Sequence, residues 1–202
     1  MVDRAQIDIT MSTIVALIVP ASEPTSIDQK DIDSVLTRPL TIGQGPAGLL
    51  IGSQRDQVEV IAGPNRIEVR DLSGRSDFAL RKIPTVLGFF VKAASSKLIS
   101  YGINFILAVP CSKPDTWITD NVLARDISEK TGKTLLGGGI SLKVSAGEKV
   151  WRVKLDPTEN DHLTVDFNAS QKIEKLPSEE ELKVELTQQF EDLMSFLDQL
   201  GL

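Results

Sequence analysis

The feature that most constrains the fold of this chain is a six-residue stretch that occurs twice, as Val19–Pro24 and Val109–Pro114. The second copy follows the first by 90 positions in a chain of 202 residues. Each copy ends an apolar run that is typical of a buried strand, because proline cannot donate a hydrogen bond within a sheet. Each is followed by a polar segment that closes on a similar tetrapeptide, Asp33–Leu36 or Asp120–Leu123. A repeat near half the chain length predicts that one folding unit has been duplicated.

Hydrophobic periodicity predicts the same order of elements in both halves, with period 2 for strands and period 3.6 for helices. In the first half we expect strands at 7–19, 49–53, 57–62 and 66–72, and helices at 26–36 and 80–94. In the second half we expect strands at 98–109, 140–144, 149–155 and 162–167, and helices at 115–130 and 178–200. The last helix should begin with a capping box at Ser178.

These elements predict an α+β fold, a tandem duplication of a β-α-β-β-β(β)-α unit. An antiparallel sheet would be covered on one face by the two longer helices. We expect the repeats at residues 1–96 and 97–202, fused into one globular domain. The order of elements resembles the tandem arrangement of TATA-binding-protein-like folds. That resemblance covers element order alone: the intercalating phenylalanines and the basic concave face of that family have no match here, so no functional residues are carried over.

Charge and composition exclude several classes of function. The net charge of −6 and the pI near 4.9 argue against non-specific nucleic-acid binding, which needs Lys and Arg to neutralise phosphates. The same balance disfavours an anionic membrane surface. The longest apolar runs fall well short of the roughly 20 residues of a membrane-spanning helix, and the first residues resemble no signal peptide. We therefore expect a soluble, cytoplasmic protein.

Two glycine-containing motifs resemble nucleotide-binding loops and are better explained otherwise. Gly43–Gly48 matches G-x-G-x-x-G, but strand-like segments follow it where a phosphate-binding loop needs a helix, which favours a glycine-rich turn between strands. Thr131–Thr134 resembles the end of a Walker A loop, but Ile127 stands where the first glycine belongs. A helix C-terminus at Gly132 explains this stretch better. No cofactor is expected.

Candidate functional residues are few. With one cysteine and one histidine, His162, the chain has no multi-Cys metal site, and we expect no metal. Cys111 is the one possible reactive thiol, although Ala21 at the equivalent position of the first repeat favours a buried structural cysteine. The candidate binding residues are Arg70, Asp71, Trp151 and Arg152, because Arg and Trp at one edge of a sheet are enriched at interfaces. The candidate interface residues form an apolar stripe on the last helix: Leu186, Phe190, Leu193, Leu197 and Leu200.

Two functions remain open at this point. The first is a non-catalytic interaction or assembly protein, an adaptor or scaffold that binds a partner protein or a second copy of itself. It rests on the duplicated sheet and on the absence of a catalytic constellation in the sequence. The alternative is a small-molecule-binding protein or enzyme with a pocket between sheet and helices, using carboxylates together with Cys111 or Arg70.

Overall fold

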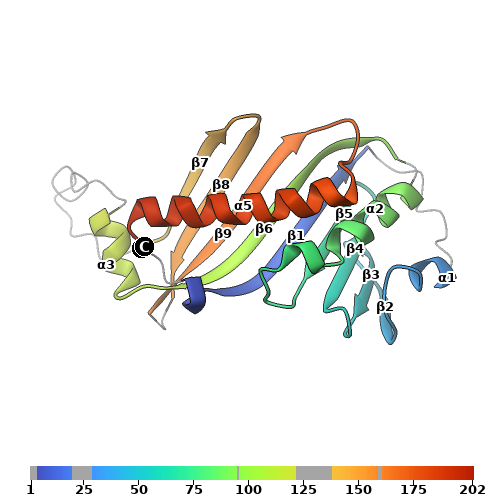
Figure 1. The fold of residues 1–202 in the computed structure, drawn as a ribbon, viewed down its shortest axis with the longest axis horizontal. Coiled ribbons are helices and arrows are strands. Elements are labelled where there is room, and N and C mark those ends of the chain that lie inside the picture. The colour runs from blue at the N-terminus through green and yellow to red at the C-terminus, as the bar shows by residue number, and fades with distance from the viewer. Residues whose placement is uncertain (1–3, 20–28, 95, 122–137, 159–160) are drawn as a thin grey trace.

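The computed structural model describes residues 4–19, 29–94, 96–121, 138–158 and 161–202 (Figure 1). Residues 20–24 of the first repeat marker, the second half of the helix expected at 115–130, and the Thr131–Thr134 motif lie outside the described residues. The strands are β1 (Asp8–Ile18), β2 (Leu40–Gly45), β3 (Gly48–Ser53), β4 (Val58–Ala62), β5 (Arg66–Asp71), β6 (Leu98–Pro110), β7 (Ile140–Ala146), β8 (Lys149–Pro157) and β9 (His162–Lys172). The helices are α1 (Gln29–Ile32), α2 (Ile83–Ala94), α3 (Pro114–Asn121) and α5 (Glu179–Leu200), with short 3₁₀ helices η1 (Arg4–Gln6) and η2 (Phe78–Leu80).

The strands of the described residues form one nine-stranded sheet in the order β2-β3-β4-β5-β1-β6-β9-β8-β7. Every neighbouring pair is antiparallel, which confirms the expected α+β fold with an antiparallel sheet. The two long apolar strands that precede the repeat markers, β1 and β6, pair with each other at the centre. The remaining strands follow outward on either side (Figure 1).

The glycine-rich motif is a hairpin. Gly45 pairs with Gly48, so Pro46 and Ala47 form the turn between β2 and β3. Gly48 has a φ of 122°, and a Cβ at this position would lie 2.1 Å from the carbonyl oxygen of Ala62. This glycine is therefore required for the close approach of β3 and β4, and no phosphate-binding helix follows it.

Strand register places an unbroken apolar row across one face of the sheet. Ile14 and Ile103 pair at the centre, and directly opposed residues continue the row to both edges. From β2 to β7 the apolar row is Ile42, Ile51, Val60, Val69, Ile14, Ile103, Ala169, Trp151 and Val144. Its central members are buried, so the core of the protein lies against this face.

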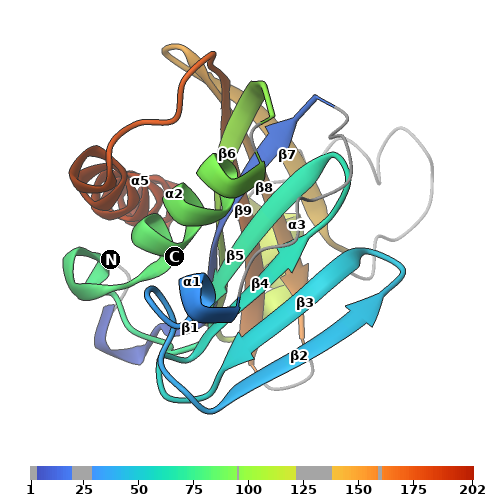
Figure 2. The same ribbon diagram turned by 90° about the vertical axis from the view of Figure 1, so that its right-hand side faces the viewer.

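The two longer helices contribute apolar side chains to this core. Helix α2 contacts β5 and β1, and α5 contacts β6, α2 and η2. Phe78 of η2 lies between α5 and the sheet, with its ring centroid 5.4 Å from those of both Phe105 and Phe190. The capping box at the start of α5 is confirmed: the Ser178 hydroxyl accepts from the backbone N–H of Glu181, whose carboxylate accepts from the backbone N–H of Ser178. Figure 2 shows α2 and α5 beside each other at one side of the sheet.

Of the helices in the described part of the chain, none combines the length and the apolar character that crossing a membrane requires.

Candidate functional site

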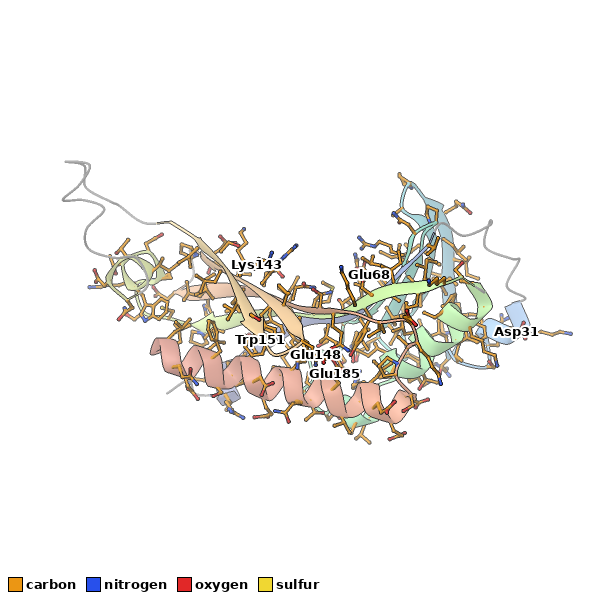
Figure 3. The ribbon with its side chains drawn as sticks, turned by 90° about the horizontal axis from the view of Figure 1, so that it is seen from above. Asp31, Glu68, Lys143, Glu148, Trp151 and Glu185 are labelled. Atoms are coloured by element: carbon orange, nitrogen blue, oxygen red, sulfur yellow. The ribbon has the colours of Figure 1, made fainter. Side chains whose placement is uncertain are left out.

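The residues that alternate with the apolar row form a second row, whose members are polar except for Gly52. Thr13 and Asn104 pair at its centre, and each further strand contributes the residue directly opposite its neighbour. From β2 to β7 the polar row is Thr41, Gly52, Glu59, Arg70, Thr13, Asn104, Asn168, Arg152 and Lys143. We call the face that carries this row the polar face. In Figure 3, Lys143 and Glu68 lie on this face, whereas Trp151 and Glu185 lie on the side of α5.

The structure divides the four candidate binding residues between the two faces. Arg70 and Arg152 both belong to the polar row. Arg70 lies on β5, next to the central strand β1, and Arg152 lies on β8, two strands from the central strand β6. Asp71 and Trp151 follow or precede them along the strand, and neighbouring residues of a strand point to opposite faces. Arg70 and Asp71 therefore do not share one binding surface, and neither do Trp151 and Arg152.

Asp71 is committed to an internal ion pair. Its side chain is 2% exposed and accepts two hydrogen bonds from Arg81, from Nε at 2.6 Å and from Nη2 at 3.1 Å. It also accepts from the backbone N–H of Ser73 at 2.8 Å. The hydrogen bond to Asp71 raises the pKa of Arg81. These contacts join the end of β5 to the segment that leads into α2.

Trp151 packs in the core. Its ring stands edge-on to Phe167, with centroids 5.3 Å apart, and to Phe196, with centroids 6.3 Å apart. Arg152 is exposed on the other face. A cation–π contact between these two neighbours is therefore not formed.

In the first half of the polar face the charges compensate one another. Arg70 donates from Nε to Glu68 at 2.6 Å and lies 3.7 Å from Glu59. Arg66 makes a second ion pair with Glu68. Two cations and two carboxylates thus form one connected cluster with no net charge.

Among the described residues in the second half of the polar face, one lysine forms an ion pair and three other cations do not. Lys154 pairs with Asp156 at 2.5 Å, and its pKa is raised by the hydrogen bond and charge of that carboxylate. Within the described residues, Lys143, Arg152 and Lys172 make no ion pair. Arg152 and Lys143 stand directly opposite each other on β8 and β7.

The centre of the polar row is held by neutral polar groups. The Asn168 side chain donates to the Asn104 side-chain oxygen across β6 and β9. Thr13 is only 2% exposed, and its hydroxyl has no hydrogen-bond partner among the residues that the structure describes. A buried hydroxyl without a partner is costly, so Thr13 is a position where the polar row reduces stability.

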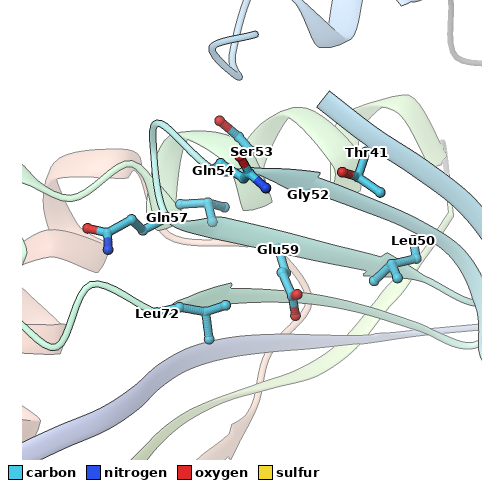
Figure 4. Close-up of a pocket in the computed structure, with 9 residues that line it drawn as sticks. Thr41, Leu50, Gly52, Ser53, Gln54, Gln57, Glu59 and Leu72 are labelled. Carbon is cyan, nitrogen blue, oxygen red and sulfur yellow. The ribbon is translucent and has the colours of Figure 1, made fainter. Parts of the chain in front are cut away.

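Two hollows lie on the polar face. The larger, of about 730 Å³, lies over β1, β6, β9 and β8. Its lining includes Leu17, Gly102, Arg152, Ser170 and Lys172. The smaller, of about 360 Å³, lies over β2, β3 and β4 and is lined by residues such as Leu50, Gly52 and Glu59 (Figure 4).

Cys111 follows β6 and is buried, with 7% of its surface exposed. Burial raises the pKa of the thiol, and the charge of Asp161 raises it further. Both effects favour the protonated thiol over the nucleophilic thiolate.

The apolar stripe of α5 packs inside the protein. Leu186, Leu193 and Leu197 have no exposed surface, Phe190 is 9% exposed and Leu200 packs partly buried against the same core. These five side chains are used by the chain itself, so a partner that contacts α5 meets its other side.

A third hollow lies between the sheet and α5. It has a volume of about 590 Å³, and its lining includes Tyr101, Lys175, Glu181 and Glu185. The Tyr101 hydroxyl donates to Glu185, which also pairs with Lys149 at 2.6 Å. Burial and this carboxylate raise the pKa of Tyr101, so the phenol stays protonated.

Among the described residues, no three His, Cys, Asp or Glu side chains come together as a metal site would require. No protein-family model matches the chain, and no curated protein is similar to it in sequence.

Proposed function

We propose that this chain is a non-catalytic interaction or assembly protein that binds a partner protein on the polar face of its sheet. The observation that carries the proposal is the polar row. The row carries no apolar side chain on any of the nine described strands. Polar side chains in such a row are suited to hydrogen bonding with another molecule.

The proposed architecture explains why this face is available. We infer a tandem duplication in which β1 and β6, β5 and β9, β4 and β8, β3 and β7, and α2 and α5 are equivalent. The strand order supports it, because the equivalent strands follow one another outward from the central pair on both sides. Each repeat would place its longer helix on the apolar face, so that the two helices complete the core and leave the polar face open.

The chemistry of the polar face also favours binding over catalysis. Its carboxylates Glu59 and Glu68 are held by arginines, and the amides of Asn104 and Asn168 hold each other. Such groups recognise and orient a partner, whereas a general base or nucleophile needs a group that is free to change its protonation or its bonding. A row of fixed donors and acceptors is typical of an interface.

Site-specific photo-crosslinking tests the proposal. A benzophenone side chain replaces Leu17, which is 42% exposed on the polar face, or in the control Val184, which is 70% exposed on α5. We expect a discrete adduct from position 17 in the native cell extract and none from position 184. An adduct with the mass of two chains would identify the partner as a second copy. Adducts of the same kind from both positions, or none from position 17, would contradict the proposal.

A second candidate function is favoured by the hollow beside Tyr101, which lies between the sheet and α5 as the alternative hypothesis requires. A small molecule there would meet Lys175 as well as the carboxylates of Glu181 and Glu185, so a ligand that carries both charges fits best. A thermal-shift screen with small zwitterionic metabolites separates the two candidates. Stabilisation that Glu185→Gln abolishes would favour the pocket over the polar face.

A further inference from the structure

We infer that the β7–β8–β9 end of the polar row binds an acidic polypeptide segment of the partner, with Lys143, Arg152 and Lys172 receiving its carboxylates. This inference rests on the proposed function and specifies the chemistry of the partner. It follows from a difference between the two halves of the polar face: the arginines of the first half form ion pairs, whereas in the described part of the chain three cations of the second half do not.

The arginines of the first half already have carboxylate partners. Arg66 and Arg70 share Glu68, and Arg70 also lies near Glu59. In the second half, the part of the chain that the structure describes supplies Lys143, Arg152 and Lys172 with no acidic partner. A protein with an overall charge of −6 thus presents three cations without an ion pair at one end of one face. An acidic partner is complementary to that end.

The position of Arg152 also favours an acidic partner. Arg152 on β8 is directly opposite Lys143 on β7, and like charges at directly opposed positions destabilise a sheet. A lysine on the edge strand β7 has a plain structural explanation, since edge charges prevent pairing with other chains. That explanation does not extend to Arg152 or Lys172, which lie on inner strands. A carboxylate bound between the cations relieves the repulsion.

The surface beside these cations suits a polypeptide. The hollow of about 730 Å³ contains Arg152 and Lys172 together with the apolar side chains of Val15, Leu17 and Val150, and Glu148 is the one carboxylate among the described residues of its lining. Gly102 leaves its floor without a side chain, and a Cβ there would lie 3.2 Å from the Asn168 amide nitrogen. A segment that alternates acidic and apolar side chains would use both kinds of lining.

A nucleic acid fits this surface less well. Single strands bind to sheets mainly by stacking bases on aromatic side chains, and no residue of the polar row is aromatic. Duplexes need a larger excess of cations than three, because affinity depends on the number of phosphates neutralised. A polypeptide is therefore the occupant that the observations favour.

The test uses the full chain and a fluorescein-labelled poly-glutamate peptide of about 12 residues, which when extended spans about 40 Å, the width of nine strands. Poly-glutamine and an oligothymidylate of similar length serve as comparison probes, and binding is read as fluorescence anisotropy at several salt concentrations. We expect poly-glutamate to bind most tightly and the variant Arg152→Gln with Lys143→Gln to bind it about tenfold more weakly. The control Lys92→Gln removes an exposed cation from α2 and should bind as the unaltered protein does.

Charge reversal gives a second test of the same cations. The variant Arg152→Glu with Lys143→Glu should lose poly-glutamate while its circular dichroism spectrum and its Tm stay those of the unaltered protein, which excludes unfolding as the cause. Equal binding of poly-glutamate by the neutralised variant, an equal loss in Lys92→Gln, or tighter binding of oligothymidylate would each overturn the inference. If poly-glutamate does not bind as expected but the adduct at position 17 still forms, the inference of an acidic partner is wrong, whereas the proposal that the polar face binds a partner is retained. If no adduct forms, the proposed function itself falls.

Discussion

Removing the carboxylate of Asp71 distinguishes a structural role from the binding role that its sequence neighbourhood suggests. In the structure, Asp71 and Arg81 form a two-point ion pair whose side chains are 2% and 12% exposed. Breaking a buried pair by removing one charge typically costs 3–5 kcal/mol, because the remaining charge is left in a poorly solvated place. Arg81 keeps some access to water, so Asp71→Asn should lower the free energy of unfolding by about 3 kcal/mol. For a chain of this length that corresponds to a fall in Tm of about 6–12 °C.

The chain offers a matched control for this substitution. Asp77 lies 4.0 Å from the same guanidinium but is 41% exposed. Asp77→Asn should therefore cost no more than about 0.5 kcal/mol. Urea unfolding followed by circular dichroism at neutral pH measures both. Replacing the pair together, with Asp71→Leu and Arg81→Met, should recover most of the loss, because well-packed apolar side chains can substitute for a buried pair.

A small effect would refute this reasoning. If Asp71→Asn costs less than about 1 kcal/mol, the pair does not stabilise the junction of β5 and α2 as its burial implies. If the same variant keeps its stability but loses the crosslinked adduct at position 17, Asp71 would be a binding residue, as its position next to Arg70 suggested.

Three further predictions concern the core, a helix cap and acid stability. Phe105 has no exposed surface, and its ring centroid lies within 5.9 Å of those of three other phenylalanines. Phe105→Ala should therefore lower the free energy of unfolding, measured in urea, by about 3–5 kcal/mol, and a decrease below about 2 kcal/mol would contradict this packing. Ser178→Ala removes the capping box of α5 and should cost about 1 kcal/mol, seen as a lower Tm, whereas Ser195→Ala in the same helix should change it little. Burial raises the pKa of Asp56, but hydrogen bonds from Lys82 and the Thr37 backbone and side chain lower it by more. The ionised Asp56 carboxylate therefore stabilises the fold fully above the ordinary carboxyl pKa of about 3.9, and this stabilisation is lost as the pH falls through the lowered pKa. Asp56→Asn should thus be less stable than the unaltered protein at pH 7, but should lose less stability between pH 5 and 2. Equal loss of stability in both proteins over that range would contradict this prediction.

Much of the fold could be predicted because its strands are long and alternate clearly. The strand expected at 98–109 is observed as Leu98–Pro110, and the helix expected at 178–200 as Glu179–Leu200. Strand β2 was missed as a separate element because glycines at its end give no alternating pattern. The motif Gly43–Gly48 was nevertheless correctly assigned to a turn between strands, since the segments on both sides are extended.

The candidate site could be predicted only in part, because sequence adjacency and spatial adjacency differ in a sheet. Arg70 and Arg152 were singled out, but their neighbours Asp71 and Trp151 point to the opposite face. The members of the polar row that were missed as candidates, such as Thr13 and Lys143, are far apart in the sequence and meet only through strand register. A usable signal was present, namely a polar residue at alternate positions inside otherwise apolar strands, as at Asn104 within β6.

The polar row owes its geometry to the core on the other side of the sheet. A slip of one residue in any strand pair would exchange the two faces of that strand, moving a residue such as Arg70 into the core and Val69 out of it. The resulting burial of a charge is far more costly than the loss of any single surface contact. The apolar row therefore fixes the register, and the register fixes which polar residues stand opposite one another. It follows that substitutions within the polar row should alter binding without altering the fold, whereas substitutions in the apolar row should disturb both.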